Sequence, residues 1–338
     1  MLHRSPALSV LDLVPVSEGS GPVEAIRAAC SAAKVAEGHG YRRYWLAEHH
    51  NSPALACSAT TVLMGAVAAA TDTIRVGSGG IMLPNHAPLK IAEDLGTLAV
   101  MYPGRIDCGL GRAPGTDPRT AERLRRGSAD LVDFIRDVTE LHGYLGPATG
   151  APGETAVIGR GAGVRLFVLG SSTGGARAAA ELGLPFSFAS HFAPDQLHEA
   201  LAVYRENFNP DAPTSQVPEP WVSAAVNVMA ADTTAEARRQ LLTLRHSFAG
   251  VLTGRRGTLV APGDTAELHP ILRSRVDHSL RVTACGTAVE VVDQLSDWAA
   301  ALELDEIVTV TYAHDPMIRL HSLGIVGEEW ARRNGGGV

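Results

Sequence analysis

The sequence contains little cysteine. Its four cysteines, Cys30, Cys57, Cys108 and Cys285, lie far apart in a chain of 338 residues, and no two of them form a Cys-x-x-Cys pair. This spacing argues against a disulfide framework. We expect reduced thiols that are largely buried.

Long apolar runs are also missing. No stretch reaches the roughly 18 uninterrupted apolar residues that a membrane-spanning helix needs, and residues 1–5 lack the pattern of a secretory signal. The net charge is −7 and no basic patch with interleaved aromatic residues occurs, which argues against nucleic-acid binding. We therefore expect a cytoplasmic protein that does not bind nucleic acid.

Strand-like segments alternate with helical patterns along the chain. The eight segments span residues 8–14, 43–47, 74–83, 106–111, 164–169, 185–190, 221–229 and 306–311. Eight such units predict a parallel sheet closed into a (β/α)₈ TIM barrel. An open doubly wound sheet is the main alternative, but no dinucleotide fingerprint follows the first strand.

We expect one domain over residues 1–338, because composition and charge do not shift midway. Residues 246–282 interrupt the alternation of strands and helices after the seventh strand. We interpret them as an insertion and expect it to act as a mobile lid.

The active site of such a barrel lies at the carboxyl ends of its strands. Polar residues and glycines cluster at these predicted ends: Asp12, Glu48, His49, His50, Gly79, Gly80, Gly111, Arg112, Gly170, Ser171, Ser172, Ser190, His191, Asn227 and Tyr312.

The Glu48-His49-His50 group is the most reactive of these segments. A histidine can act as an acid or a base near neutral pH, and a carboxylate beside it can fix its tautomer. A buried hydrogen-bonded pair that only shapes the barrel mouth is an equally open interpretation. A metal site is disfavoured, because adjacent strand residues point to opposite faces.

Gly79 and Gly80 interrupt an otherwise apolar strand. Two glycines in a row indicate a bulge or the close approach of a bulky group, and a packing kink is the alternative.

The stretch Gly170, Ser171, Ser172, Thr173, Gly174, Gly175 lies between a strand and a helix. Hydroxyls and backbone N–H groups at a helix N-terminus can bind an anion, and Arg112 at another strand end can grip phosphate oxygens. Ordinary helix capping by Ser or Thr is the alternative.

Five segments together resemble the luciferase-like flavin monooxygenases. They are YWLAEHH (44–50), VGSGGIMLP (76–84), PGRIDCGLGRAPG (103–115), FVLGSS (167–172) and AAELGLP (179–185). The combination in this order is specific and extends from the first strand to residue 307. The start of the chain and residues 112–117 resemble a subgroup that tailors bacterial natural products.

The resemblance implies a TIM barrel with an insertion after strand seven, usually dimeric through its early helices. It implies reduced FMN as the cofactor, or the deazaflavin F420 in some relatives. A cis peptide at Gly79–Gly80 would lie behind the flavin ring. Phosphate would bind at Arg112 and at the stretch from Ser171 to Gly175, with His49 as acid/base and His50 also in the pocket.

Two residues depart from luciferases proper. Gly111 stands where they carry a cysteine, which argues against light emission, and Ser171 replaces an acidic residue of their phosphate loop.

Our sequence-based hypothesis is a monooxygenase that oxidises a small organic substrate through a C4a-peroxyflavin formed from reduced FMN and O₂. Because no NAD fingerprint occurs, a separate NAD(P)H:flavin reductase would supply the reduced flavin. An F420-dependent enzyme that transfers hydride and a non-catalytic flavin-binding homologue are the two alternatives.

Overall fold

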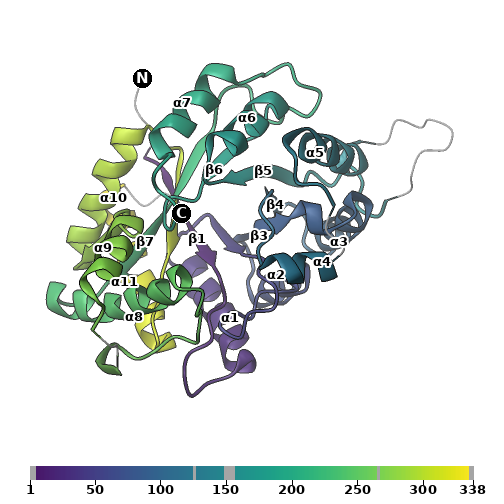
Figure 1. Cartoon of the computed structure of the whole chain (residues 1–338). Coiled ribbons are helices and arrows are strands. Elements are labelled where there is room, and N and C mark those ends of the chain that lie inside the picture. Colours follow the sequence, from purple (N-terminus) through teal and green to yellow (C-terminus); the bar gives the residue numbers. More distant parts are fainter. Residues whose placement is uncertain (1–4, 125–126, 148–156, 265–266, 335–338) are drawn as a thin grey trace.

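Eight parallel strands close into a barrel, as the sequence predicted (Figure 1). The computed structural model describes residues 5–124, 127–147, 157–264 and 267–334. β1 pairs with both β2 and β9, and this double pairing closes the sheet. The barrel strands are β1 (Ala7–Asp12), β2 (Arg43–Leu46), β3 (Arg75–Met82), β4 (Ile106–Gly111), β5 (Arg165–Gly170), β6 (Phe186–Phe188), β7 (Val222–Ala230) and β9 (Glu306–Val310).

Helices surround the barrel and cover its outer face (Figure 1). In α1 the buried residues Ala25, Ala29, Ala32 and Ala36 recur at helical spacing, so small side chains form its inner face. Every residue of β7 is buried, as expected for a strand covered on both faces. The helices are α1 (Pro22–Gly38), α2 (Thr60–Ala70), α3 (Pro88–Met101), α4 (Pro118–Arg123), α5 (Leu131–Leu145), α6 (Thr173–Leu182), α7 (Leu197–Asn207), α8 (Thr234–Leu252), α9 (Pro270–Ser279), α10 (Ala288–Leu302) and α11 (Pro316–Arg333), with short 3₁₀ turns at η1 (Leu83–Asn85) and η2 (Pro262–Asp264).

None of the helices in the described ranges combines the length and the apolar character that crossing a bilayer requires.

The segment after β7 has more regular structure than the sequence indicated. α8 runs on to Leu252, beyond the predicted start of the insertion at residue 246, and η2 and α9 follow. A ninth strand, β8 (Thr283–Gly286), then pairs with residues 227–230 at the end of β7, whereas β9 pairs with residues 223–227. β8 was not predicted from the sequence, because its four residues are too few to show a strand period.

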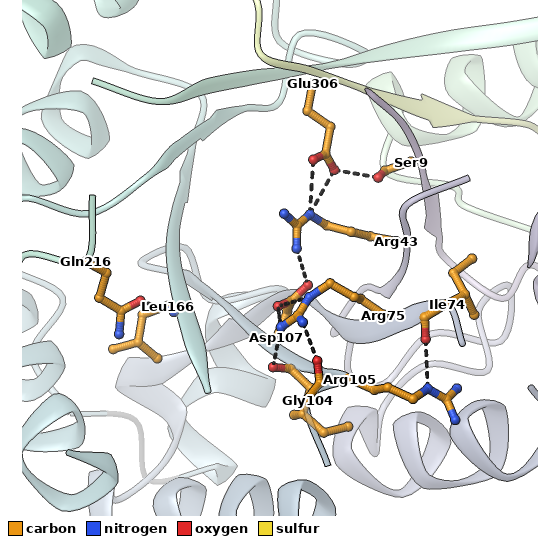
Figure 2. A network of polar contacts seen from close by, with 11 residues as sticks. Ser9, Arg43, Ile74, Arg75, Gly104, Arg105, Asp107, Leu166, Gln216 and Glu306 are labelled. Carbon is orange, nitrogen blue, oxygen red and sulfur yellow. Dashed lines mark hydrogen bonds and ion pairs between the residues drawn. The ribbon is translucent and has the colours of Figure 1, made fainter. Parts of the chain in front are cut away.

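Buried charges cross the barrel interior near the amino ends of the strands (Figure 2). The Arg43 guanidinium donates to Glu306 from Nε, at 3.0 Å, and to Asp107 from Nη1, at 2.6 Å. Ser9 donates a 2.5 Å hydrogen bond to Glu306, and Arg75 donates from Nε to Asp107 at 2.9 Å, so two cationic side chains contact this carboxylate. The network ties β1, β2, β3, β4 and β9 together at the end of the barrel remote from the mouth.

Replacing Arg43 with methionine should destabilise the fold by about 3–5 kcal/mol, because the buried carboxylates of Glu306 and Asp107 would lose the positive charge of the guanidinium that pairs with both. The matched control is Arg136→Met, which removes an exposed pair with Asp133 and should cost about 0–1 kcal/mol. Urea unfolding measures both. Equal midpoints for the two variants would contradict a stabilising role for the buried network.

Candidate active site

Glu48 connects the loop after β2 to the end of β3. Its side chain is buried, and Oε1 accepts hydrogen bonds from Nε2 of His50 at 2.7 Å and from Nε2 of His86 at 3.0 Å. The backbone N–H of Met82 donates to Oε2 at 3.2 Å, and Asn85 donates to Oε1 at 3.2 Å. One carboxylate therefore holds two segments of the mouth in place.

Burial alone would raise the pKa of Glu48, but the hydrogen bonds from His50 and His86 outweigh it and lower this pKa to about 2. The carboxylate is therefore ionised at neutral pH. One of its oxygen atoms and one nitrogen of each imidazole lie within 4.8 Å of one another, so the three side chains could also ligate a cation. His86, which the sequence did not indicate as a possible ligand, and not His49, joins His50 in this cluster.

His86 and Asn85 were missed as site residues. They lie directly after β3, in and beside the η1 turn, which places them at the same mouth as Glu48. Their position two to three residues past a predicted strand end was the signal that could have identified them.

His49 does not join the Glu48 cluster. Its Nδ1 lies 3.1 Å from the carbonyl oxygen of Gly115, in the loop after β4. A carbonyl can only accept, so Nδ1 carries the proton and Nε2 keeps its lone pair. Burial, followed by the positive charge of Arg256, lowers the pKa of His49 to about 4. His49 is thus a neutral imidazole at pH 7, with an unprotonated nitrogen available as a base.

Further residues from other segments of the mouth interact electrostatically with His49 or with its neighbours. His191 follows β6, is 7% exposed, and interacts electrostatically with His49. Arg256, from the segment after α8, acts on His49, on the Cys57 thiol and on Tyr312. His191 and Tyr312 were recognised in the sequence only as strand-end residues, and Arg256 was not singled out within the predicted insertion.

The Gly79–Gly80 peptide bond is cis, the conformation that the resemblance implied, and the β3–β4 register shifts between Gly79 and Ile81. A Cβ atom added to Gly79 would lie 2.5 Å from Cδ1 of Leu11, and one added to Gly80 would lie 2.7 Å from the carbonyl oxygen of Gly109. Backbone atoms therefore exclude a side chain at Gly80, whereas a side chain at Gly79 would require the Leu11 side chain to move.

Arg112 and the N-terminus of α6 meet, as predicted. A Cβ atom on Gly174 would lie 3.1 Å from Nη2 of Arg112, and Nη1 donates to the carbonyl oxygen of Ala129 at 3.0 Å. Ser172 is the N-cap residue of α6, but its side chain makes no capping hydrogen bond. The ordinary capping interpretation is therefore wrong for Ser172 in this structure, and a guanidinium faces a helix N-terminus, where an anion is favoured.

Comparison with known proteins identifies the family. Residues 8–303 match the model of the luciferase-like monooxygenases. A luciferase-like monooxygenase of Escherichia coli K12 is 42% identical over 325 residues, which cover 95% of this chain and 96% of that protein. An N-acetyl-S-alkylcysteine monooxygenase of Bacillus subtilis is 33% identical, with 90% of this chain and 92% of that protein covered.

Solved structures share the barrel. The crystal structure of apo-MsnO8 superposes with a TM-score of 0.86 at 34% identity, covering 96% of this chain and 98% of that one. Two more distant structures show the fold alone. One is the oxygenating constituent of a diketocamphane monooxygenase of Pseudomonas putida in complex with FMN (TM-score 0.73, 18% identity, 97% and 98% covered). The other is an F420-dependent secondary alcohol dehydrogenase (TM-score 0.65, 15% identity, 95% and 98% covered).

The sequence match spans nearly the whole chain, and the closed barrel with its cis peptide and helix-terminal arginine has the architecture that the resemblance implied. This chain belongs to the luciferase-like monooxygenase family.

Proposed function

We propose that the protein uses reduced FMN and O₂ to oxidise a small organic substrate at the carboxyl mouth of the barrel. The observation that carries this proposal is the meeting of Arg112 with the N-terminus of α6, at the same barrel mouth as the Gly79–Gly80 bulge and His49. A natural-product substrate is a hypothesis that rests on the sequence resemblance.

The residues present suit a phosphorylated flavin. Arg112 would hold the phosphate together with Ser171, Ser172 and Thr173 and the backbone around Gly174 and Gly175, where no side chain blocks an approaching anion. The tricyclic ring would lie against the bulge at Gly79–Gly80. F420 also carries a phosphate, so this cradle suits both cofactors.

The flavin, when bound, supplies the electrons and activates oxygen. The protein's residues would position the substrate, exclude water and manage protons. Nε2 of His49 is the atom that would accept or return a proton, since Nδ1 is committed to Gly115. Glu48, with His50 and His86, would fix the loop that carries His49.

A titration of the full chain with reduced FMN and reduced F420 without oxygen, followed by admission of O₂, tests the cofactor assignment. We expect FMN to bind, and its reoxidation to consume O₂. Arg112→Met should weaken FMN binding about 10- to 100-fold, because charge-assisted hydrogen bonds contribute about 1.5–3 kcal/mol.

Arg177→Met, an exposed arginine on the same helix α6, is the matched control and should bind FMN normally. Binding of F420 without O₂ consumption would replace this proposal with hydride transfer. Binding of neither cofactor would refute both.

Replacing His49 with alanine should lower kcat about 10²–10⁴-fold, the range for loss of a general acid or base, while FMN affinity stays near that of the wild type. An N-acetyl-S-alkylcysteine is the first substrate to assay, because a relative 33% identical is named for that class. Since the pKa of His49 is lowered to about 4, the protonated, inactive form should appear only near pH 4 and not near 6.5.

His198→Ala, which removes an exposed histidine on α7, should leave kcat unchanged. Unaltered turnover in the His49 variant would remove His49 from the proton-transfer role.

We further propose two protein partners. A separate NAD(P)H:flavin reductase would deliver reduced FMN, because the sequence has no dinucleotide fingerprint. A second copy of the chain would cover α2, on which Val62, Ala66 and Ala69 form an exposed apolar face at helical spacing.

Val62 is 71% exposed, and Val62→Asp should convert a dimer to a monomer, since it would bury a charge without a partner. Sedimentation equilibrium measures the state. The control is Val132→Asp, on the exposed face of α5, where the side chain is 79% exposed. A wild-type monomer, or a variant that stays dimeric, would contradict an interface at α2.

A further inference from the structure

We propose that Glu48, His50 and His86 form a binding site for a divalent transition-metal ion, and that Zn²⁺ is the ion that suits these ligands. The inference goes beyond the proposed function and does not depend on it. The chemistry of the three side chains, the fixed position of the carboxylate and the exposure of the two imidazoles support it.

The cluster contains the ligand types of a zinc centre. One carboxylate oxygen of Glu48 and one nitrogen of each imidazole lie within 4.8 Å of one another. Within the described ranges, no other three His, Cys, Asp or Glu side chains come together in this way. Two histidines and one glutamate are the protein ligands of known catalytic zinc sites, whereas Mg²⁺ and Ca²⁺ prefer oxygen ligands. The ligand set therefore favours a transition metal such as Zn²⁺.

The ligand atoms are close to the separations that a bound ion requires. Oε1 of Glu48 lies 2.7 Å from Nε2 of His50 and 3.0 Å from Nε2 of His86. Ligand atoms placed tetrahedrally at about 2.0–2.2 Å from Zn²⁺ are about 3.3–3.6 Å apart. Each imidazole nitrogen would thus move away from the carboxylate by less than about 1 Å. Both rings would coordinate the ion through Nε2 and carry their protons on Nδ1.

Neighbouring groups hold the Glu48 carboxylate in place before an ion binds. The residue is only 2% exposed. The backbone N–H of Met82 donates to Oε2, and Nδ2 of Asn85 donates to Oε1, both at 3.2 Å. Hydrogen bonds of this kind orient the ligating carboxylates of metal sites. An ion at Glu48 would join the loop after β2 to the η1 turn, where the hydrogen bonds from the two histidines now do so.

The two imidazoles leave a route for the ion from the barrel mouth. The side chain of His50 is 13% exposed and that of His86 is 28% exposed, whereas the Glu48 side chain is buried beneath them. Three protein ligands occupy three of the four positions of a tetrahedral ion, and the fourth takes water or a substrate group. The cluster therefore has the composition of an open zinc site at the mouth.

The test is equilibrium dialysis of the full chain, without added flavin, against Zn²⁺ and separately against Mg²⁺, with bound metal measured by atomic absorption. The wild type should bind Zn²⁺ at this site and should not bind Mg²⁺. His86→Gln and His50→Gln should each weaken Zn²⁺ binding at least about 10- to 100-fold, because even loss of a residue that only supports a ligand has this effect. Circular dichroism checks folding, and whichever variant remains folded decides the outcome.

His278→Gln is the matched control. His278 pairs with Asp195 at 2.7 Å on the surface, but no third ligand joins this pair among the described residues. Its loss should leave Zn²⁺ binding unchanged.

A wild type that binds no Zn²⁺ would overturn the proposal. Zn²⁺ binding that persists in the His86 and His50 variants, or that disappears in the His278 variant, would also overturn it, because the ion would then occupy another site. Equal binding of Mg²⁺ would contradict a site with nitrogen ligands. FMN binding and O₂ consumption by the zinc-free chain bear only on the proposed function, so the two proposals can fail separately.

Discussion

The backbone hydrogen bonds between β1 and β9 join the two ends of the chain and close the sheet. Ala7 lies opposite Glu306 and Leu8 opposite Ile307 in this parallel pair. Closure brings the carboxyl ends of all eight barrel strands to one mouth, so Glu48, Arg112 and His191, far apart in sequence, become neighbours of one site. The register also places Glu306 inside the barrel, where Arg43 compensates its charge.

Charged side chains are paired differently at the two ends of the barrel. At the amino end, Arg43 forms ion pairs with both Asp107 and Glu306 inside the barrel (Figure 2). At the mouth, Glu48 is paired, whereas Arg256 has no acidic partner among the described residues and Nδ1 of His191 accepts or donates no hydrogen bond. This contrast agrees with the division of such barrels into a stabilising end and a functional end.

Burial determines the protonation states at the mouth. It lowers the pKa of His49 to about 4 and that of His191 to about 3, so both rings are neutral at pH 7. The hydrogen bond to Gly115 then assigns the His49 proton to Nδ1. Burial keeps His49 neutral, and the Gly115 carbonyl leaves Nε2 as the atom that can act as a base. Neither effect can be inferred from the Glu48-His49-His50 stretch of the sequence.

The sequence by itself determined the eight-strand alternation, the cis bond at Gly79–Gly80 through family resemblance, and the pairing of Arg112 with the start of α6. The strand alternation and the position of Arg112 depend on local patterns, namely the apolar period and the place of a residue at a strand end, whereas the cis bond was implied only by the resemblance. Only the tertiary structure showed β8, the Glu48–His86 contact, and the electrostatic effects between His49 and both Arg256 and His191. β8 is too short to have a period of its own, and the other contacts join segments whose spacing in the chain carries no information about distance. Their geometry depends on barrel closure and on how the loops fold back over the mouth, which are long-range packing effects that a local pattern does not encode.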